Sequence, residues 1–192
     1  MRCKTWIAIV IGLLLFLPAA GCGNSQTREE QPVHTRKATT GQPKAIPHLT
    51  TGELQARLIQ ARGFQFTQKS KPSFPACIHG TAVDAGTGIK FGCDIYAASA
   101  DSVQLVRFTV DGSQAGNRVS TTKFNTIARS FLHDIAGLTT DNPGRAAIEQ
   151  WLAASVRWAD KPVVVFKKTV EQVEYELRGS SGRRTLELKP AK

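Results

Sequence analysis

An unbroken apolar run, Trp6 to Leu17, follows a short basic stretch that carries Arg2 and Lys4. Its twelve residues would extend about 18 Å as a helix, whereas the hydrocarbon core of a membrane is about 30 Å thick. The run is therefore too short for a permanent membrane span and is typical of the hydrophobic part of an export signal. We expect residues 1–21 to be removed on export, so the folded protein has to be built from the rest of the chain.

Small residues stand directly before a cysteine soon after this run, in the sequence Ala19-Ala20-Gly21-Cys22-Gly23. This pattern resembles the lipobox of bacterial lipoproteins, in which the signal is cut before the cysteine. The thiol and the new amine are then acylated, with palmitate among the acyl groups. The resemblance implies that Cys22 is the lipid attachment site, because two or three acyl chains anchor a protein firmly where one does not. The alternative is an ordinary secretory signal cut after Ala20 or Gly21, which leaves Cys22 as a free thiol.

The same resemblance predicts where the protein resides. A lipidated Cys22 anchors the chain to a bacterial membrane, facing the periplasm or the cell exterior. In this family Gly23 after the cysteine favours the outer membrane in a cell that has one. The membrane is then the first expected partner, through the N-terminal lipid.

The chain is basic. Removing residues 1–21 takes away Arg2 and Lys4 and no acidic residue, so the net charge falls from +10 to +8. An exported basic protein meets phospholipid head groups, lipopolysaccharide phosphates and acidic proteins. An envelope protein or an anionic envelope polymer is therefore a candidate partner, and the compartment argues against nucleic acid. A basic surface without a specific partner is the alternative.

Residues 22–48 are polar and rich in Gln, Thr, Pro and Lys, with almost no large apolar side chain. Such a stretch buries too little surface to offset the entropy of ordering it. We expect a flexible tether after the lipidated Cys22, with a reach of roughly 25–30 Å. Residues 49–192 are expected to form a single disulfide-stapled domain.

The hydrophobic pattern of residues 49–192 alternates between helical and strand periods. Helices are predicted from Thr50 to Gly63, from Thr121 to Ala136 and from Asn142 to about Trp158. Strands are predicted near residues 64–66, 76–83, 89–96, 101–110, 162–166, 173–177 and 183–188. Strands joined by hairpin turns pair antiparallel. The fold class is therefore α+β, with one curved, mainly antiparallel sheet of about five to seven strands and about three helices packed on one face.

Cys77 and Cys93 are the two cysteines of the predicted domain, and export to an oxidising compartment favours a disulfide between them. A hairpin in which Val83 faces Thr87 brings Cys77 opposite Cys93, and a bridge across this loop contributes on the order of 3 kcal/mol. Zinc is the alternative, since His79 would share their face. Oxidation of the thiols and the lack of Cys-x-x-Cys or His-x-x-x-His spacing weigh against a metal.

Ser120 and Lys123 match the Ser-x-x-Lys pattern of penicillin-recognising enzymes, in which the lysine takes the proton of the serine. The Lys-Thr-Gly strand of those enzymes is missing, because Lys168-Thr169 is followed by Val170. Helix capping by Ser120 or Thr121 explains the pattern better. No catalytic residue, metal ligand or cofactor-binding motif can be nominated from spacing, so a catalytic activity is open but unsupported.

Two pairs of residues are candidates for contact with a partner or an anion. Trp151 and Trp158 lie seven positions apart on one side of a predicted helix, where they are either core residues or partly exposed binding residues. Arg183 and Arg184 follow the predicted turn 179–182 and could contact an anion, although a solvated hairpin tip is the simpler interpretation.

The sequence favours a lipid-anchored cell-envelope protein whose domain is a non-catalytic binding or adaptor module. A small periplasmic hydrolase, or the accessory subunit of an enzyme, is the alternative. A purely structural lipoprotein is a third hypothesis, which an exposed apolar patch would argue against. A polar pocket with converging His, Asp or Ser side chains would separate the first two.

Overall fold

The computed structural model describes residues 44–192, except 72–73, 117–118 and 141. The predicted export signal and the predicted lipid attachment site Cys22 lie outside the described residues. The elements are α1 (Thr51–Arg62), β1 (Gln65–Lys71), β2 (Phe74–Val83), β3 (Lys90–Ser99), β4 (Ser102–Asp111), α2 (Thr121–Thr139), α3 (Asn142–Ser155), the 3-10 turn η2 (Val156–Trp158), β5 (Val165–Val170), β6 (Val173–Ser180) and β7 (Arg183–Pro190). None of the described helices is both long and apolar enough to cross a membrane.

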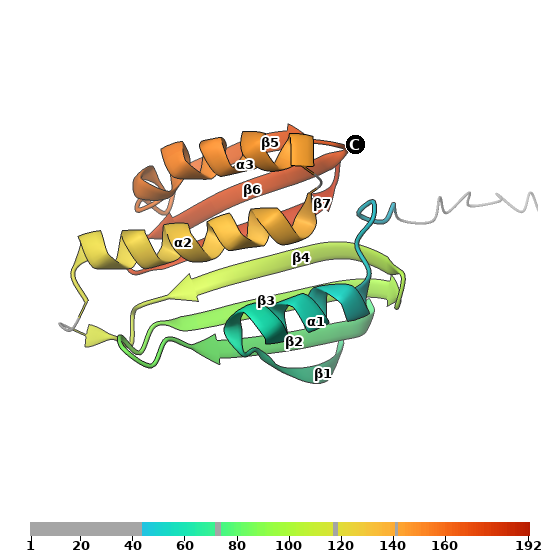
Figure 1. Cartoon of the computed structure of the whole chain (residues 1–192), viewed down its shortest axis with the longest axis horizontal. Helices are drawn as coiled ribbons and strands as arrows, with labels where there is room; N and C mark the ends of the chain where they lie inside the picture. Colours follow the sequence, from blue (N-terminus) through green and yellow to red (C-terminus); the bar gives the residue numbers. More distant parts are fainter. Residues whose placement is uncertain (1–43, 72–73, 117–118, 141) are drawn as a thin grey trace, which may run out of the picture. The chain divides into compact units, whose positions relative to one another are not determined.

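The strands form one open, seven-stranded antiparallel sheet in the order β1-β2-β3-β4-β7-β6-β5. It consists of two meanders, β1 to β4 and β5 to β7, which are joined where β4 pairs with β7. The three helices cover one face of the sheet (Figure 1). The predicted α+β class is thus confirmed, with the described strand number at the upper end of the expected range.

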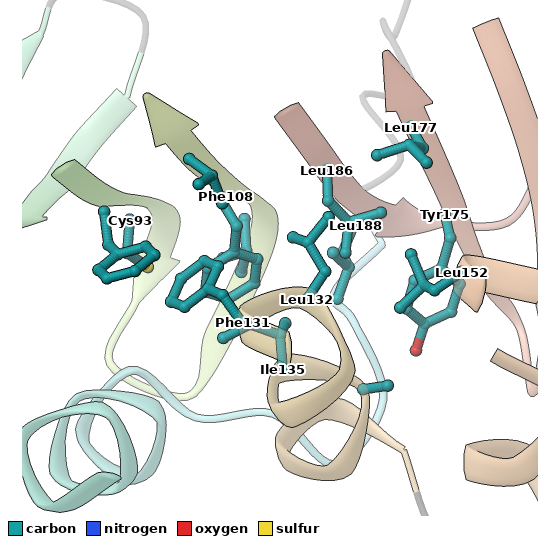
Figure 2. Close-up of a cluster of buried hydrophobic side chains, with 14 of the residues drawn as sticks. Cys93, Phe108, Phe131, Leu132, Ile135, Leu152, Tyr175, Leu177, Leu186 and Leu188 are labelled. Carbon is teal, nitrogen blue, oxygen red and sulfur yellow. The ribbon is translucent and has the colours of Figure 1, made fainter. Parts of the chain in front are cut away.

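The helix-covered face carries the apolar side chains of every strand. One row crosses the sheet from β1 to β5 through Phe66, Gly80, Cys93, Phe108, Leu186, Leu177 and Phe166. Phe131 of α2 packs onto this row, with its ring centroid 4.6 Å from that of Phe91 and 6.3 Å from that of Phe108 (Figure 2). A side chain on Gly80 would clash with the ring of Phe66, which lies 2.3 Å from where a Cβ would be.

The helices begin where the sequence predicts. The side chain of Thr50 accepts a hydrogen bond from the backbone N–H of Glu53 at the start of α1, and Gly63 ends that helix with φ of 64°. Ser120 accepts from the N–H of Lys123 at 3.3 Å, so its predicted role as the cap of α2 is confirmed. Polar atoms at these helix ends are therefore satisfied by local side chains.

The folded domain begins earlier than residue 49. Ile46 and Leu49 are buried in the core, and the backbone N–H of Ile46 donates to the carbonyl of Val103 at 2.7 Å. The N–H of Thr51 donates to the carbonyl of Ala100. These bonds fix the entering segment on the turn between β3 and β4, so its last residues belong to the folded domain.

The predicted register of the hairpin β2–β3, and the disulfide that depends on it, are wrong. Val83 pairs with Lys90 rather than with Thr87, Cys77 pairs with Tyr96, and Cys93 pairs with Gly80. The pairing is shifted by an odd number of residues, which sends Cys93 to the other face of the sheet. Cys93 lies in the core under the helices, Cys77 faces the opposite side, and both are buried free thiols.

The length of the loop between the strands explains this shift. The side chain of Asp84 accepts hydrogen bonds from the N–H and the hydroxyl of Thr87, each at 2.9 Å. Gly88 takes a left-handed φ of 76° and donates its N–H to the carbonyl of Asp84. The backbone N–H of Asp84 in turn donates to Ile89. Residues 84–89 thus form a wide loop in place of the tighter turn that the prediction assumed.

Candidate functional site

The face of the sheet opposite the helices carries charged side chains. One cross-strand row on this face runs through Thr67, His79, Asp94, Arg107, Glu187, Glu176 and Lys167. His79 Nδ1 lies 2.6 Å from Asp94 Oδ1, and Arg107 Nε donates to Glu187 Oε1 at 2.7 Å. These pairs hold the row together. Along each strand its residues stand next to those of the apolar row and point to the opposite face, as expected from strand alternation.

Glu187 is the centre of this charged row. Arg178 Nη2 lies 2.6 Å from Glu187 Oε1, the same oxygen that Arg107 contacts. Burial alone would raise the pKa of Glu187, but the hydrogen bonds from Arg107 and Arg178 outweigh it and the pKa is lowered. The carboxylate is therefore kept charged by two guanidinium groups, which is a structural role.

The zinc alternative gains no support from the geometry. Cys93 lies on the other face from Cys77 and His79, and His79 is engaged with Asp94. Within the described part of the chain, no three His, Cys, Asp or Glu side chains are grouped so that they could hold a metal ion. Burial, followed by the charge of Asp94, raises the pKa of the Cys93 thiol well above its ordinary value, which favours an unreactive core residue.

A polar cavity of about 630 Å³ lies at the C-terminal end of α2. It is lined by Pro47, His48, Glu53, Arg57, Leu138, Thr139, Thr140, Glu171, Gln172 and Val173. These residues come from the entering segment, α1, the end of α2 and the β5–β6 turn. A second cavity of about 380 Å³ shares Pro47 and Gln172 with it and extends towards Lys44 and Ala191.

Backbone strain is concentrated around the larger cavity. Of the residues that the structure describes, only three other than glycine have positive φ: His48 at 58°, Glu171 at 49° and Gln172 at 67°. All three line the cavity. Such conformations are costly for residues with a Cβ, and they persist where the surrounding structure holds them, often at binding sites.

Several contacts fix the walls of this cavity. Arg57 contacts the carboxylate of Glu53 and donates to the carbonyl of Leu138 at 3.2 Å, which ties α1 to α2. Glu171 lies against the first turn of α3, with its carboxyl carbon 2.7 Å from where a Cβ on Gly144 would be. The carbonyl of Gln172 accepts from the N–H of Ala191 at 2.7 Å. The polar groups that line the cavity are therefore fixed by contacts among α1, α2, the β5–β6 turn with the start of α3, and the C-terminal segment.

A buried hydroxyl lies close to this region. Tyr175 of β6 is fully buried, and burial raises its pKa to about 12. Its hydroxyl has no well-formed hydrogen bond. The Thr139 hydroxyl donates to the carbonyl of Ile135 at 3.1 Å. This unsatisfied group is one cost of the local arrangement.

A groove follows the outer side of α2 near its N-terminal half. It consists of cavities of about 300 and 280 Å³ that share Thr126 and Arg129. The larger part is lined by Thr122, Asn125, Thr126, Arg129, Ala153, Val156 and Arg157. We call these residues the α2–η2 groove.

The four residues predicted to contact a partner differ in their exposure and contacts. Trp151 is half-buried and packs against the core. Trp158 is 58% exposed, and the guanidinium of Arg157 stacks on its ring at 4.9 Å. Arg183 is exposed and pairs across the strands with Asp111. Arg184 is fully buried, so the interpretation of a solvated hairpin tip is wrong for it.

Arg184 links three elements from within the domain. Its Nε donates to the carbonyl of Val156 at 2.9 Å, and its Nη2 donates to Asn125 Oδ1 at 2.8 Å. Its Nη1 donates to the carbonyls of Arg183 and Ser180. The inward direction follows from strand alternation, since Arg184 lies two positions from Leu186 on the covered face. Val156 and Asn125 line the α2–η2 groove, so Arg184 lies directly behind it.

Sequence reasoning did not find the larger cavity. The polar composition of residues 22–48 predicts that His48 belongs to the tether, and the lining residues are spread over positions 47–173 with no motif among them. The one local signal is the two-residue connection Glu171-Gln172 between alternating strands, since such turns require positive φ at both positions. The comparisons with protein-family models, curated proteins and solved structures found no match for this chain.

Proposed function

We propose that this protein is a lipid-anchored cell-envelope protein whose folded domain is a non-catalytic binding module. The lipobox-like sequence supports a membrane anchor at Cys22. The polar composition that follows supports a tether between anchor and domain. The single observation that carries the binding role is the polar cavity of about 630 Å³ around which the left-handed residues gather.

The size and composition of this cavity suit a small polar ligand. Ligand sites in proteins have volumes of about 300–1,000 Å³. The wall carries carboxylate, guanidinium, hydroxyl and amide groups together with the apolar side chains of Pro47, Leu138 and Val173. A ligand with both hydrogen-bond donors and acceptors can be recognised by such a wall.

The walls are preorganised by the fold. His48 is held between a segment bonded to β4 and the start of α1, while Glu171 and Gln172 form a two-residue turn that is pinned on both sides. Binding to a preformed site avoids the entropy cost of ordering loops. The positive φ of Glu171 and Gln172 is what a two-residue hairpin turn requires, so the proposed binding role rests on the preformed polar cavity that these residues line together with His48.

In-cell photo-crosslinking tests this proposal. A diazirine residue at Pro47 is placed on the cavity wall, and the matched control carries the same residue at Val83, which is exposed and outside the cavity. We expect a defined adduct from position 47 alone. The adduct should disappear when Thr140→Trp fills the cavity in a protein that still melts cooperatively. Equal labelling at both positions, or none at either, would contradict a binding role for this cavity.

A hydrolase is the second candidate, because His48 lines the same cavity as the carboxylates of Glu53 and Glu171. If the protein is a hydrolase that uses His48 as its base, the wild type should cleave the ligand and release product. The His48→Ala variant should then retain the intact ligand. A binding protein would give the same ligand mass in both. Mass spectrometry of the crosslinked adduct distinguishes the two.

A further inference from the structure

The chemistry of the α2–η2 groove is independent of the larger cavity. Its polar lining consists of the two guanidinium groups of Arg129 and Arg157, the amide of Asn125 and the hydroxyls of Thr122 and Thr126. Among the described residues, no carboxylate lines this part of the groove. Guanidinium groups only donate hydrogen bonds, and hydroxyls can do so. The groove therefore offers an unusual concentration of donors.

Asn125 is oriented so that it adds to these donors. Its Oδ1 accepts a hydrogen bond from Arg184 Nη2 at 2.8 Å. An amide whose oxygen is used in this way directs its NH₂ group elsewhere, and Asn125 itself lines the groove. The side that faces a ligand is thus the donor side.

A buried positive charge lies behind the same residue. Arg184 is fully buried and forms its hydrogen bonds with Asn125 and backbone carbonyls, with no carboxylate among its partners in the described chain. Asp160 is the acidic group whose charge acts on it. A guanidinium remains charged in proteins, and a buried charge without an ion-pair partner is costly. An anion in the groove would offset part of that cost.

The two arginines at the surface of the groove are available to a ligand. Arg129 is exposed and has no ion pair among the described residues. Arg157 is held over the ring of Trp158 at 4.9 Å, which restricts its side chain without neutralising its charge. Glu149, the acidic side chain of α3, is already engaged by His133 and Arg145.

We infer that the α2–η2 groove binds a phosphate group. Planar guanidinium forks, an amide NH₂ and hydroxyls together match the several acceptor oxygens of a phosphate. The cavity of about 300 Å³ is larger than one phosphate and continues into the space beside Ser130 and His133. The phosphate is therefore the anionic part of a larger molecule whose remainder lies along α2.

Calorimetry with soluble phosphates tests this inference on the full-length protein in a neutral detergent. Inorganic phosphate and glycerol phosphate are the probes. We expect saturable binding. The affinity should fall about 10-fold or more in Arg129→Gln or Arg157→Gln, because each change removes one charged hydrogen bond to the phosphate. Arg183→Gln removes the same charge from an exposed site outside the groove and should change affinity little. Equal weakening in all three variants would show only a non-specific basic surface and overturn the inference.

Asn125→Asp provides a variant in which folding and binding move in opposite directions. A carboxylate at this position keeps the hydrogen bond from Arg184 and gives that buried cation an ion-pair partner, so the melting temperature should rise. The same carboxylate replaces the donor in the groove, so phosphate binding should be lost. A variant that binds phosphate as well as the wild type would contradict the proposed site.

The source of the phosphate is distinguished by a second arm with lipid vesicles. If phosphatidylglycerol vesicles compete with glycerol phosphate and phosphatidylcholine vesicles do not, the ligand is an anionic lipid head group. If neither competes, the ligand is a soluble phosphorylated molecule. Absence of binding to every probe would refute the phosphate site while leaving the photo-crosslinking result at the larger cavity unaffected.

Discussion

At the scale of single residues, two buried charges are stabilised in different ways. Glu187 on the open face is bound by Arg107 and Arg178, so its charge is balanced by opposite charge. Arg184 under the helices donates its hydrogen bonds to backbone carbonyls and to Asn125, so these bonds are made with neutral groups. The first arrangement stabilises the sheet, and the second keeps a positive potential behind the α2–η2 groove.

Glu187 makes the stability of the domain sensitive to acid. Its pKa in the folded protein is lower than its ordinary value of 4.5, so its contribution is complete above that value and is lost as the pH falls through the folded pKa. We expect Glu187→Gln to be less stable than the wild type by about 1–3 kcal/mol near neutral pH, a difference that shrinks in acid. Urea unfolding at several pH values measures this.

Asp101→Asn is the matched control for that series. Asp101 is exposed in the turn between β3 and β4, and exposed charges contribute little to stability. Its unfolding free energy should follow the wild type at each pH. A Glu187→Gln variant with the same stability as the wild type throughout would contradict the role assigned to the arginine pair.

At the scale of elements, most helices and strands follow from local patterns, whereas the strand register does not. The strand predicted at residues 162–166 is an exception, since β5 spans Val165–Val170. Thr50, Gly63 and Ser120 mark helix ends in the sequence and do so in the structure. The β2–β3 register depends on how Asp84 folds the loop, and a change of a few loop residues exchanges the faces of all later side chains. This is why a correct hairpin was predicted with an incorrect pairing of Cys77 and Cys93.

From the register of the β2–β3 hairpin we expect both cysteines of the purified domain to be free thiols. Cys77 and Cys93 lie on opposite faces of the sheet, so both should react with a maleimide reagent once the chain is unfolded in guanidinium without reductant. Cys77→Ser and Cys93→Ser should each lose one label, as read by mass spectrometry of the peptides. Labelling that appears only after reduction would show a disulfide and contradict the observed register.

At the scale of the whole molecule, the architecture is predictable and the sites are not. The alternation of apolar residues determines a sheet covered on one face by helices, as the row from Phe66 to Phe166 shows. The larger cavity joins His48 to Glu171, which are far apart in sequence and meet only because β4 pairs with β7. The sequence indicates Arg184 as a candidate for anion contact, but its inward direction depends on the pairing of the complete sheet.

The proposed role also depends on where the domain is held. The proposed binding role places the domain at the cell envelope, where an anchor would hold it. Acylation of Cys22 by more than one chain would retain it firmly. This anchor is the central claim of the functional proposal.

Fractionation of cells that express a C-terminally tagged protein tests that claim most directly. We expect the wild type in the membrane fraction, and Cys22→Ala in the soluble fraction. Cys3→Ala is the matched control, since it removes a cysteine from the same N-terminal region outside the lipobox-like sequence, and it should remain in the membrane fraction. A Cys22→Ala protein that stays with the membrane would contradict the lipid anchor.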